Sequence, residues 1–491
     1  MTLDLAVAIV HYHLRPGGVT GVIEQTVETL DAHGIPSVVL TGEPSPVPLE
    51  YPLRFHLDED LGYRSGTAHA PVDEVVKRLR RTAEEALGEP PKVWHFHNHA
   101  LGKNLNTPLV VEALARDGAP LLLQLHDFLE DGRPENYRRL LQHIGRGDPD
   151  RLAAVLYPQA PHVHYAALNG RDAAFLKEAG VKPERIHCLP NSVYRPRETT
   201  QILGRRREGR APVYLYPTRA IRRKNLGEFL LWAALAEQGV RFAVTLSPRN
   251  PAARGAYERW VALAENLKLP VDFEVGAGAS VRLASLLQEA HAAVSTSVAE
   301  GFGLCFLEPW LQHCPVIGRK LPEITSEFEA EGVDLSGCYT SCPVPIEWVG
   351  GDHLRRVMAQ GMKATFASYG RTGSDSNVED ALQAALEGET VDFGRLDETL
   401  QEHVIDRVVV SRDAAQWLRA RRIFPAEVPQ ETIEANSDCV RREYSLERYG
   451  ENLLLVYEDV MASPKGPVEA LNGNALLDRF LSPERFFLLR T

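Results

Sequence analysis

The sequence predicts an α/β protein with two doubly wound domains, and two observations carry that prediction. The chain has 491 residues, and single hydrophobic cores stop growing beyond about 250–300 residues, so two or more domains are expected. Short β-rich runs alternate with helical runs twice along the chain, which is typical of parallel sheets wrapped by helices. We therefore expect a first domain at 1–195, a linker rich in arginine and glycine at 196–211, and a second domain at 212–440.

The first domain is predicted to begin with a strand and a helix, which four further strands and two further helices follow. The first strand covers 5–12, and a helix follows at 19–33 with Val22, Ile23, Val27 and Leu30 on one face. The other strands are expected at 92–97, 120–126, 162–169 and 185–189, with helices at 107–116 and 171–179. This alternation predicts one complete Rossmann-like domain.

The second domain repeats the alternation and is then interrupted. Its strands are expected at 213–218, 242–247, 271–275, 292–297 and 315–317, separated by helical stretches. The segment at about 350–440 is polar at first and then helical, and we interpret it as an insertion or lid. The last part, 441–491, reads as C-terminal helices that pack back on the first domain. In two such facing domains, ligands bind outside the carboxyl ends of the strands, in a central cleft.

Composition excludes several classes of protein. The net charge of −12 disfavours a nucleic-acid partner. No run of about 18 apolar residues is present, so stable membrane insertion is not expected, and the first residues lack the basic start of a signal peptide. Six scattered cysteines indicate a reducing, cytoplasmic location. Cys338 and Cys342 have no second pair at matching spacing, so they do not predict a metal site.

The most informative segment contains Glu300 and Glu308 on either side of Gly301-Phe302-Gly303-Leu304. An apolar strand, a glycine turn and an expected helix bring backbone amides and a helix N-terminus to one place, which attracts phosphate. Carboxylates at the same place would repel a bare phosphate, whereas sugar hydroxyls suit them. The segment therefore predicts a ligand that carries both phosphate and sugar.

Gly17 and Gly18 follow the first strand and precede a helix, so the backbone there can approach a ligand closely. A plain turn is the alternative, and the position after the first strand favours the ligand. The Gly-x-Gly-x-x-Gly pattern of dinucleotide enzymes is absent, which argues against a nicotinamide cofactor.

Histidines end two strands of the first domain. His126 closes the strand at 120–126, where it can hydrogen-bond a sugar hydroxyl; the alternative is a capping histidine held by Asp127. His95, His97 and His99 alternate along another strand end. We expect surface histidines or a polar acceptor wall there rather than a metal site.

A basic cluster follows the first strand of the second domain. Arg219 and Lys224 lie five residues apart, with Arg222 and Arg223 between them. A leaving diphosphate develops negative charge, which a positioned arginine and lysine stabilise. The alternative is a solvated basic turn.

The acceptor side is predicted only from the loop after His126. Arg133 could clamp a carboxylate or phosphate on the acceptor, with Tyr137 and His97 nearby; a surface salt bridge is the alternative. The two Asp-x-Asp triplets, at 58–60 and 148–150, follow no buried strand, and we assign both to loops.

In this order, the motifs resemble those of retaining GT-B glycosyltransferases of family four, relatives of glycogen synthase and sucrose-phosphate synthase. The two glutamates Glu300 and Glu308 around Gly-Phe-Gly-Leu carry the resemblance most specifically. The basic pair, the strand-end histidine, the Gly17-Gly18 loop and the Pro-Val-Ile strand at 315–317 match in order. The resemblance covers about residues 1–330 and the C-terminal helix. One departure is Lys320-Leu321-Pro322-Glu323 where the family often has two glycines, which puts the substrate in doubt.

The resemblance implies roles for these residues. Arg219 and Lys224 would hold the donor diphosphate, Glu300 and the amides of 302–304 would contact donor sugar and phosphate, and Glu308 would accept hydrogen bonds from the ribose. His126 would touch the sugar, and domain closure would bring Gly17 and Gly18 over the donor. The family needs no metal and no cofactor beyond its donor, here a UDP-, GDP- or ADP-hexose.

The sequence thus predicts a cytoplasmic, metal-independent, retaining hexosyltransferase that acts on a small soluble hydroxyl acceptor, with compatible-solute or disaccharide synthesis as one guess. A GT-B nucleotide-sugar epimerase and a non-catalytic sugar-nucleotide-binding scaffold are the alternatives.

Overall fold

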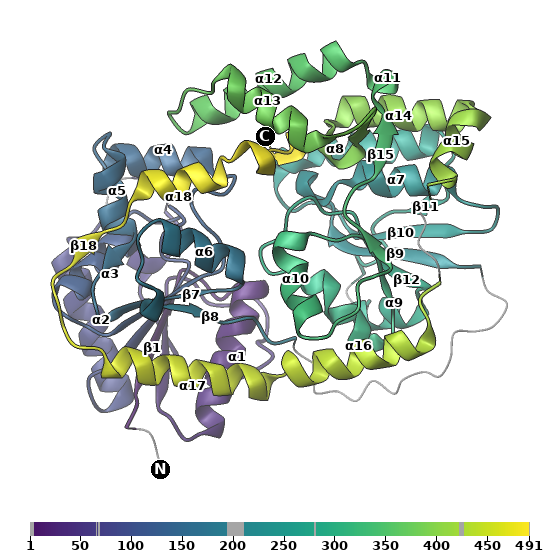
Figure 1. Ribbon diagram of the computed structural model, residues 1–491. Coiled ribbons are helices and arrows are strands. Elements are labelled where there is room, and N and C mark those ends of the chain that lie inside the picture. Colours follow the sequence, from purple (N-terminus) through teal and green to yellow (C-terminus); the bar gives the residue numbers. More distant parts are fainter. Residues whose placement is uncertain are drawn as a thin grey trace. The chain divides into compact units, whose positions relative to one another are not determined.

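The computed structural model describes residues 4–64, 66, 69–193, 211–278, 281–421 and 427–490 (Figure 1). The chain forms two compact units. Unit 1 comprises residues 1–194, 368–370 and 444–481, and unit 2 comprises 195–367, 371–443 and 482–491. The predicted linker at 196–211 lies outside the described residues except for its last position.

Unit 1 is built on a seven-stranded parallel sheet in the order β3-β2-β1-β4-β5-β7-β8. Its strands are β1 (Val7–His11), β2 (Ser37–Thr41), β3 (Phe55–Leu57), β4 (Val93–His97), β5 (Leu121–Leu125), β7 (Val163–Ala167) and β8 (Ile186–Cys188). The first crossover runs from β1 outward to β2, and the chain later returns to β4 on the other side of β1. This reversal makes β1 and β4 the topological switch point, where ligands of such sheets bind.

Helices cover both faces of the unit 1 sheet. They are α1 (Gly18–Ala32), α2 (Val72–Leu87), α3 (Asn106–Arg116), α4 (Pro134–His143), α5 (Pro149–Leu156), α6 (Gly170–Glu178), α17 (Leu446–Ala462) and α18 (Gly473–Phe480). In Figure 1, α17 lies beside α1, and the Thr26 and Tyr449 hydroxyls of these helices are 2.8 Å apart. Leu453, Val456 and Val460 of α17 are buried against the apolar face of α1 and the sheet. A short two-stranded antiparallel sheet of β6 (Pro158–Gln159) and β18 (Glu469–Ala470) also holds the returning chain to this unit.

Unit 2 has a six-stranded parallel sheet in the order β11-β10-β9-β12-β13-β14. The strands are β9 (Val213–Arg219), β10 (Arg241–Leu246), β11 (Val271–Asp272), β12 (Ala292–Ser295), β13 (Val316–Arg319) and β14 (Cys338–Tyr339). Here the switch point lies between β9 and β12. The fold class predicted from the sequence, two Rossmann-like α/β domains, is confirmed.

Pro217 interrupts the central strand β9 near its carboxyl end. Proline has no backbone N–H to donate to the ladder, so it is found at edges and bulges. The β9–β10 register shifts between Val244 and Leu246, and pairing of β9 with β12 is described only as far as Leu215. Thr245 Oγ1 donates to the Thr218 carbonyl at 2.8 Å, so this carbonyl has a hydrogen-bond partner near the irregular end of the strand. The two switch-point strands therefore separate at their carboxyl ends.

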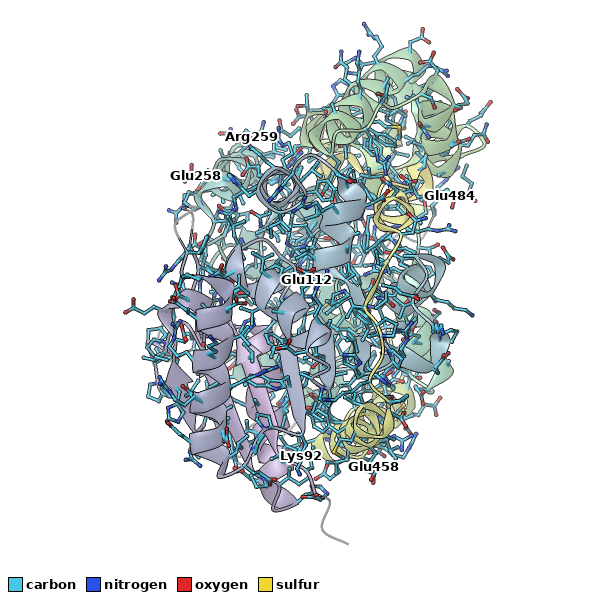
Figure 2. All side chains as sticks on the ribbon, turned by 90° about the vertical axis from the view of Figure 1, so that its left-hand side faces the viewer. Lys92, Glu112, Glu258, Arg259, Glu458 and Glu484 are labelled. Atoms are coloured by element: carbon cyan, nitrogen blue, oxygen red, sulfur yellow. The ribbon has the colours of Figure 1, made fainter. Side chains whose placement is uncertain are left out.

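The helices of unit 2 differ in exposure: the helix at Leu226–Leu235 is almost wholly buried, whereas others have one face in water. They are α7 (Leu226–Leu235), α8 (Pro251–Asn266), α9 (Leu283–Glu289), α10 (Pro322–Ala330), α11 (Ile346–Val349), α12 (Gly351–Ser368), α13 (Asp375–Ala385), α14 (Glu398–Val410), α15 (Arg412–Arg419) and α16 (Gln430–Glu443). On α8, Tyr257 and Trp260 are buried, whereas Glu258 and Arg259 are exposed and project from the surface in Figure 2. One face of α8 thus packs on the unit and the other meets water.

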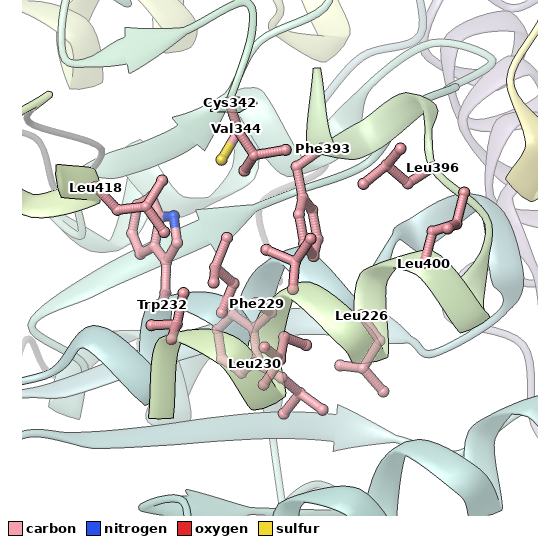
Figure 3. Close-up of a cluster of buried hydrophobic side chains, with 14 of the residues drawn as sticks. Leu226, Phe229, Leu230, Trp232, Cys342, Val344, Phe393, Leu396, Leu400 and Leu418 are labelled. Atoms are coloured by element: carbon pink, nitrogen blue, oxygen red, sulfur yellow. The ribbon is translucent and has the colours of Figure 1, made fainter. Parts of the chain in front are cut away.

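The segment expected as an insertion or lid contributes to the core of unit 2. An antiparallel sheet of β15 (Pro343–Pro345), β17 (Thr390–Asp392) and β16 (Leu386–Glu387) leads into α14. Phe393, Leu396 and Leu400 face Leu226 and Phe229 of α7 in Figure 3, and all belong to one buried cluster. Leu354, Met358 and Leu382, from α12 and α13, belong to the same cluster, so the segment expected as an insertion or lid contributes to the core of unit 2 along its length.

A buried ion cluster joins the same segment to the sheet. Arg319, the last residue of β13, donates to Glu228 at 2.7 Å and to Asp392 at 2.6 Å, and its side chain is 2% exposed. Tyr339 also donates to Glu228, at 2.7 Å. A Cβ at Gly394 would lie 2.8 Å from Arg319 Nη2, so glycine lets the backbone pass close to the guanidinium.

The structure differs from the sequence prediction after the Gly-Phe-Gly turn. Two short 3₁₀ turns, Leu304–Phe306 (η4) and Glu308–Gln312 (η5), stand where an α-helix was expected. Pro309 disfavours the helical conformation of the residue before it and removes a hydrogen-bond donor. The helix N-terminus expected to attract phosphate at this place is therefore absent from the described residues, and backbone amides of the turn remain.

No helix among the described residues is long and apolar enough to cross a membrane.

Candidate functional site

Lys224, predicted to hold a diphosphate, and Glu300, predicted to contact the donor sugar and phosphate, meet at the switch point of unit 2. Lys224 lies in the turn η3 (Arg222–Lys224) that follows β9, and Glu300 lies in the loop that follows β12. The Lys224 ammonium donates to Glu300 Oε1, and Arg223 Nη1 lies 3.1 Å from Glu300 Oε2. Ser297 Oγ also donates to Glu300, at 2.6 Å. The structure thus brings together the first glutamate of the motif and the lysine of the basic cluster.

The turn that carries Lys224 is held on both sides. Tyr216 Oη donates to the Lys224 carbonyl at 2.7 Å, and Thr296 Oγ1 donates to the Asn225 carbonyl at 2.9 Å. The backbone N–H of Val298 donates to the Arg223 carbonyl at 3.0 Å. Asn225 adopts a left-handed conformation with φ of 51°, which asparagine tolerates better than most residues. These contacts join the two loops of the switch point into one rigid element.

Electrostatics keep Glu300 ionised. Burial alone would raise the pKa of Glu300, but the charges of Lys224 and Arg223, with hydrogen bonds from Lys224 and Ser297, lower it to about 2. A carboxylate held in this way is an acceptor for hydroxyl groups at any physiological pH.

Arg219 ends β9 and stands apart from this ion cluster. Its guanidinium has no ion-pair or hydrogen-bond partner among the described residues, and burial together with the charge of Arg249 lowers its pKa. A half-buried arginine without a partner is free to bind an anion. Arg222, by contrast, forms a bidentate ion pair with Glu398 of α14, in which Nη2 and Oε2 are 2.8 Å apart.

Glu308 behaves unlike Glu300. No hydrogen-bond or ion-pair partner of its carboxyl group is found in the described part of the chain, and burial raises the pKa of Glu308 to about 7. The Gly-Phe-Gly turn before it packs through Phe302, whose ring meets Phe328 edge-on at 5.5 Å. Gly303 adopts φ of 98°, a conformation that favours glycine. A half-buried carboxyl next to this turn, without a partner among the described residues, suits a ligand with hydroxyl donors.

In unit 1, Gly17 and Gly18 begin α1 at the carboxyl end of β1. Gly17 is extended, and a Cβ on Gly18 would meet no atom within 4 Å. The packing of unit 1 therefore does not require glycine at position 18. The absence of a side chain there leaves open space next to the backbone. A cavity of about 240 Å³ adjoins this helix end and is lined by Gly17, Glu24 and Glu50 among others.

His126 follows β5, and its ring lies against that of His97. His97 Nδ1 is 2.9 Å from His126 Nε2, and the rings are stacked at 5.2 Å. The backbone amides of His126 and Asp127 donate to Asn98 Oδ1, while Asp127 pairs with Arg133. His126 is therefore held by His97 rather than by Asp127.

The expectation of surface histidines on β4 was wrong. His95, His97 and His99 are 0%, 1% and 0% exposed, because β4 is a central strand covered on both faces. His97, predicted as an acceptor contact, is thus more deeply buried than His126, which is 7% exposed. The described residues contain no group of three or more His, Cys, Asp or Glu side chains placed to hold a metal ion.

The other two predicted acceptor residues are engaged within unit 1. Arg133 Nη2 pairs with Asp127 at 2.9 Å and Nη1 donates to the Phe128 and Asp131 carbonyls. Tyr137 is 3% exposed. The loop salt bridge considered as the alternative for Arg133 is present.

Sequence reasoning missed Ser297, Glu398 and the lysine–glutamate pair itself. Ser297 carried a usable signal, because it follows the buried strand β12 at the switch point. Glu398 carried none, since it is 176 positions from Arg222 along the chain.

One relative of known activity is similar in sequence. The mannosylglucosyl-3-phosphoglycerate synthase of Petrotoga mobilis is 29% identical over 344 residues, which are 65% of this chain and 66% of that protein. The chain therefore spans just under two thirds of the length of this relative. No family model matches the chain.

Solved structures agree on the fold. Sucrose-phosphate synthase from Thermosynechococcus elongatus matches with a TM-score of 0.53 at 14% identity, over 94% of this chain and 100% of that one. A glycosyltransferase from Rickettsia africae matches with a TM-score of 0.54 at 12% identity, over 94% and 100%. Anabaena HepE, solved with UDP and glucose, gives 0.51 at 12% identity, over 92% and 99%.

Proposed function

We propose that this protein, which has the GT-B fold and resembles glycosyltransferases in sequence and structure, is a hexosyltransferase that uses a nucleoside diphosphate sugar. The observation that carries the proposal is the cluster at the switch point of unit 2, where Lys224 and Arg223 pair with Glu300 and Arg219 has no partner among the described residues. Cations at this place offset the charge that develops on a leaving diphosphate.

The donor is oriented by carboxylates on two sides. Glu300, kept ionised by its basic neighbours, accepts hydrogen bonds from hydroxyls of the hexose, and the amides of 302–304 face the diphosphate. Glu308, which lacks a partner among the described residues, accepts from the ribose hydroxyls. Anabaena HepE was solved in complex with UDP and glucose, which makes UDP-glucose one donor to test.

The reaction we propose retains the anomeric configuration. The bond between the anomeric carbon and the phosphate oxygen breaks, and the acceptor oxygen attacks on the same face. The proton of the acceptor hydroxyl passes to the leaving phosphate oxygen. Arg219 and Lys224 stabilise the charge on that diphosphate, so we propose that no metal ion is required.

The acceptor is a small hydroxyl compound. The name of the Petrotoga relative describes a product that contains a phosphoglycerate group, which supports an anionic, water-soluble acceptor of that class. None of the described cysteines forms a disulfide bond, which supports the proposal of a reducing, cytoplasmic location.

The first test is thermal unfolding with UDP, GDP, ADP, their hexose conjugates and NAD as a control. A ligand at 100 times its Kd adds about 2.7 kcal/mol of stability, enough for a visible shift in midpoint. One nucleotide family is expected to shift the midpoint equally with and without a chelator. A shift that disappears with chelator would contradict metal independence, and no shift from a folded sample would favour a non-catalytic scaffold.

Two further measurements separate the rivals. Incubation of the donor without acceptor distinguishes a transferase from an epimerase, because an epimerase converts the nucleotide sugar by itself. An acceptor screen with phosphoglycerate compounds and uncharged sugars then identifies the acceptor, and the anomeric configuration of the product tests retention.

Donor binding is expected to strengthen as pH rises through about 7. Glu308 must be ionised to accept two ribose hydroxyls, and in the free protein its pKa is raised to about 7. Binding therefore releases a proton below that pH, and the Kd at pH 6 should be about tenfold higher than at pH 8. Calorimetric titration of the nucleoside diphosphate at both pH values measures the ratio.

The Glu308→Gln variant should bind more weakly and lose this pH dependence. Glu130 of unit 1 provides the matched control, because burial also raises its pKa to about 7 while its carboxylate accepts from Tyr157. Glu130→Gln should keep the dependence. If Glu308→Gln kept it and Glu130→Gln lost it, the ribose assignment would be wrong.

A further inference from the structure

The histidines at the carboxyl ends of β4 and β5 form a buried pair that is joined by a single N–H···N hydrogen bond. His97 Nδ1 and His126 Nε2 are 2.9 Å apart. Burial lowers the pKa of His126 to about 3 and that of His97 well below its ordinary value, so both rings are neutral at physiological pH. One of the two nitrogens therefore carries the hydrogen and the other accepts it.

The surroundings of His97 decide which ring donates. His97 Nε2 is buried and has no hydrogen-bond partner in the described residues. If His126 donated, His97 would carry its hydrogen on Nε2, and a buried N–H would be left without an acceptor. If His97 donates through Nδ1, only a lone pair is left unsatisfied, and unsatisfied buried donors are the rarer of the two.

The nearest histidine does not compete for this proton. The His95 ring is tilted by 30° against that of His97, with ring centroids 4.3 Å apart, but both nitrogens of His95 have other partners. His95 Nδ1 lies 2.8 Å from Tyr457 Oη, and Nε2 lies 3.0 Å from Gln124 Oε1. His11 Nδ1 reaches only the His97 carbonyl, at 3.1 Å. Neither His95 nor His11 therefore forms a hydrogen bond with the ring nitrogens of His97 or His126.

We propose that His97 is a positioning residue, which holds His126 in the tautomer with its hydrogen on Nδ1. That nitrogen has no hydrogen-bond partner in the part of the chain that the structure describes. His126 then presents a hydrogen-bond donor, not an acceptor, at the carboxyl end of the unit 1 sheet. The ligand group that meets it is an oxygen with a free lone pair, such as a sugar hydroxyl or an anionic oxygen. This role in turnover rests on the proposed glycosyl transfer; the tautomer itself does not.

Nitrogen-15 NMR of histidine-labelled, ligand-free protein measures the tautomer directly. The ring signals of His126 are assigned by their loss in His126→Gln. In the wild-type protein, Nδ1 is expected at a protonated shift and Nε2 at an unprotonated one. The reverse pattern would overturn the proposal whatever the protein catalyses.

Three variants test the contribution of His97. His97→Phe keeps a ring but removes the donor, so His126 should populate both tautomers and kcat should fall about tenfold, the size of one lost hydrogen bond, with little change in KM for the donor. His97→Asn places an amide donor near the position of the His97 Nδ1 atom, so it should restore the single His126 tautomer and the wild-type kcat. His99→Phe, an equally buried change on the same strand end, should leave the His126 tautomer unaltered.

The outcomes separate the two proposals. An unchanged tautomer in His97→Phe overturns the positioning role. The expected tautomers without turnover of any donor would contradict the proposed function and leave the positioning role standing.

Discussion

Lys224→Ala is expected to lower kcat by about two to three orders of magnitude, the usual effect of removing one preorganised group that stabilises developing negative charge. The fold should persist, because Glu300 keeps Arg223 at 3.1 Å and Ser297 at 2.6 Å. Arg219→Ala should have a similar effect on turnover and a smaller effect on stability, since its guanidinium has no partner among the described residues. Steady-state kinetics with the donor found by thermal unfolding measures both.

Arg241→Ala is the matched control for these variants. Arg241 is the first residue of β10, at the amino ends of the strands of the same sheet, and its pair with Asp272 is exposed. Turnover of this variant should be that of the wild type. If Lys224→Ala and Arg219→Ala also turned over normally, the assignment of the diphosphate to this cluster would fail.

Arg319→Met is expected to destabilise unit 2 by about 3–5 kcal/mol, because it leaves buried carboxylates without their cation. Glu228 and Asp392 would then face each other in the core, and the Thr340 carbonyl would lose a donor at 3.0 Å. Tryptophan fluorescence during urea unfolding reports mainly this unit, since Trp94 alone of the six tryptophans lies in unit 1.

Two comparisons test the origin of that loss. Arg241→Met removes an exposed arginine from an ion pair and should change stability by no more than about 1 kcal/mol. Replacing Arg319, Glu228 and Asp392 together by apolar residues should cost less than Arg319→Met alone, because no charge is then left unpaired. A triple variant less stable than the single one would show that packing, not charge, dominates here.

Local patterns predicted several short apolar strands closely, although β2 and β3 of unit 1 were not predicted. The strands at 92–97 and 213–218 were predicted within one residue of β4 and β9, because runs bounded by turn residues leave few alternatives. The strand expected at 292–297 ends at Ser295. Thr296 and Ser297 turn their hydroxyls to the Lys224 turn and to Glu300 instead, which local propensity does not reveal.

What the sequence did not predict depends on distant partners. No local pattern marks Arg319 as buried, because its partners Glu228 and Asp392 are 91 and 73 positions away along the chain. The burial of His95 and His97 likewise follows from the place of β4 in the middle of the sheet, which strand order alone determines. Pro309, by contrast, is a local signal against an α-helix that runs through Glu308.

The basic turn after β9 has a consequence for how an anion reaches it. The protein carries a net charge of −12, so at long range it repels a negatively charged nucleotide. Screening limits each field to about 8 Å at physiological ionic strength, so the attraction of Arg219 and its neighbours acts only near contact. Salt weakens the distant repulsion and the local attraction together. Association should therefore depend little on ionic strength, and the turn discriminates among anions that have already arrived rather than steering them in.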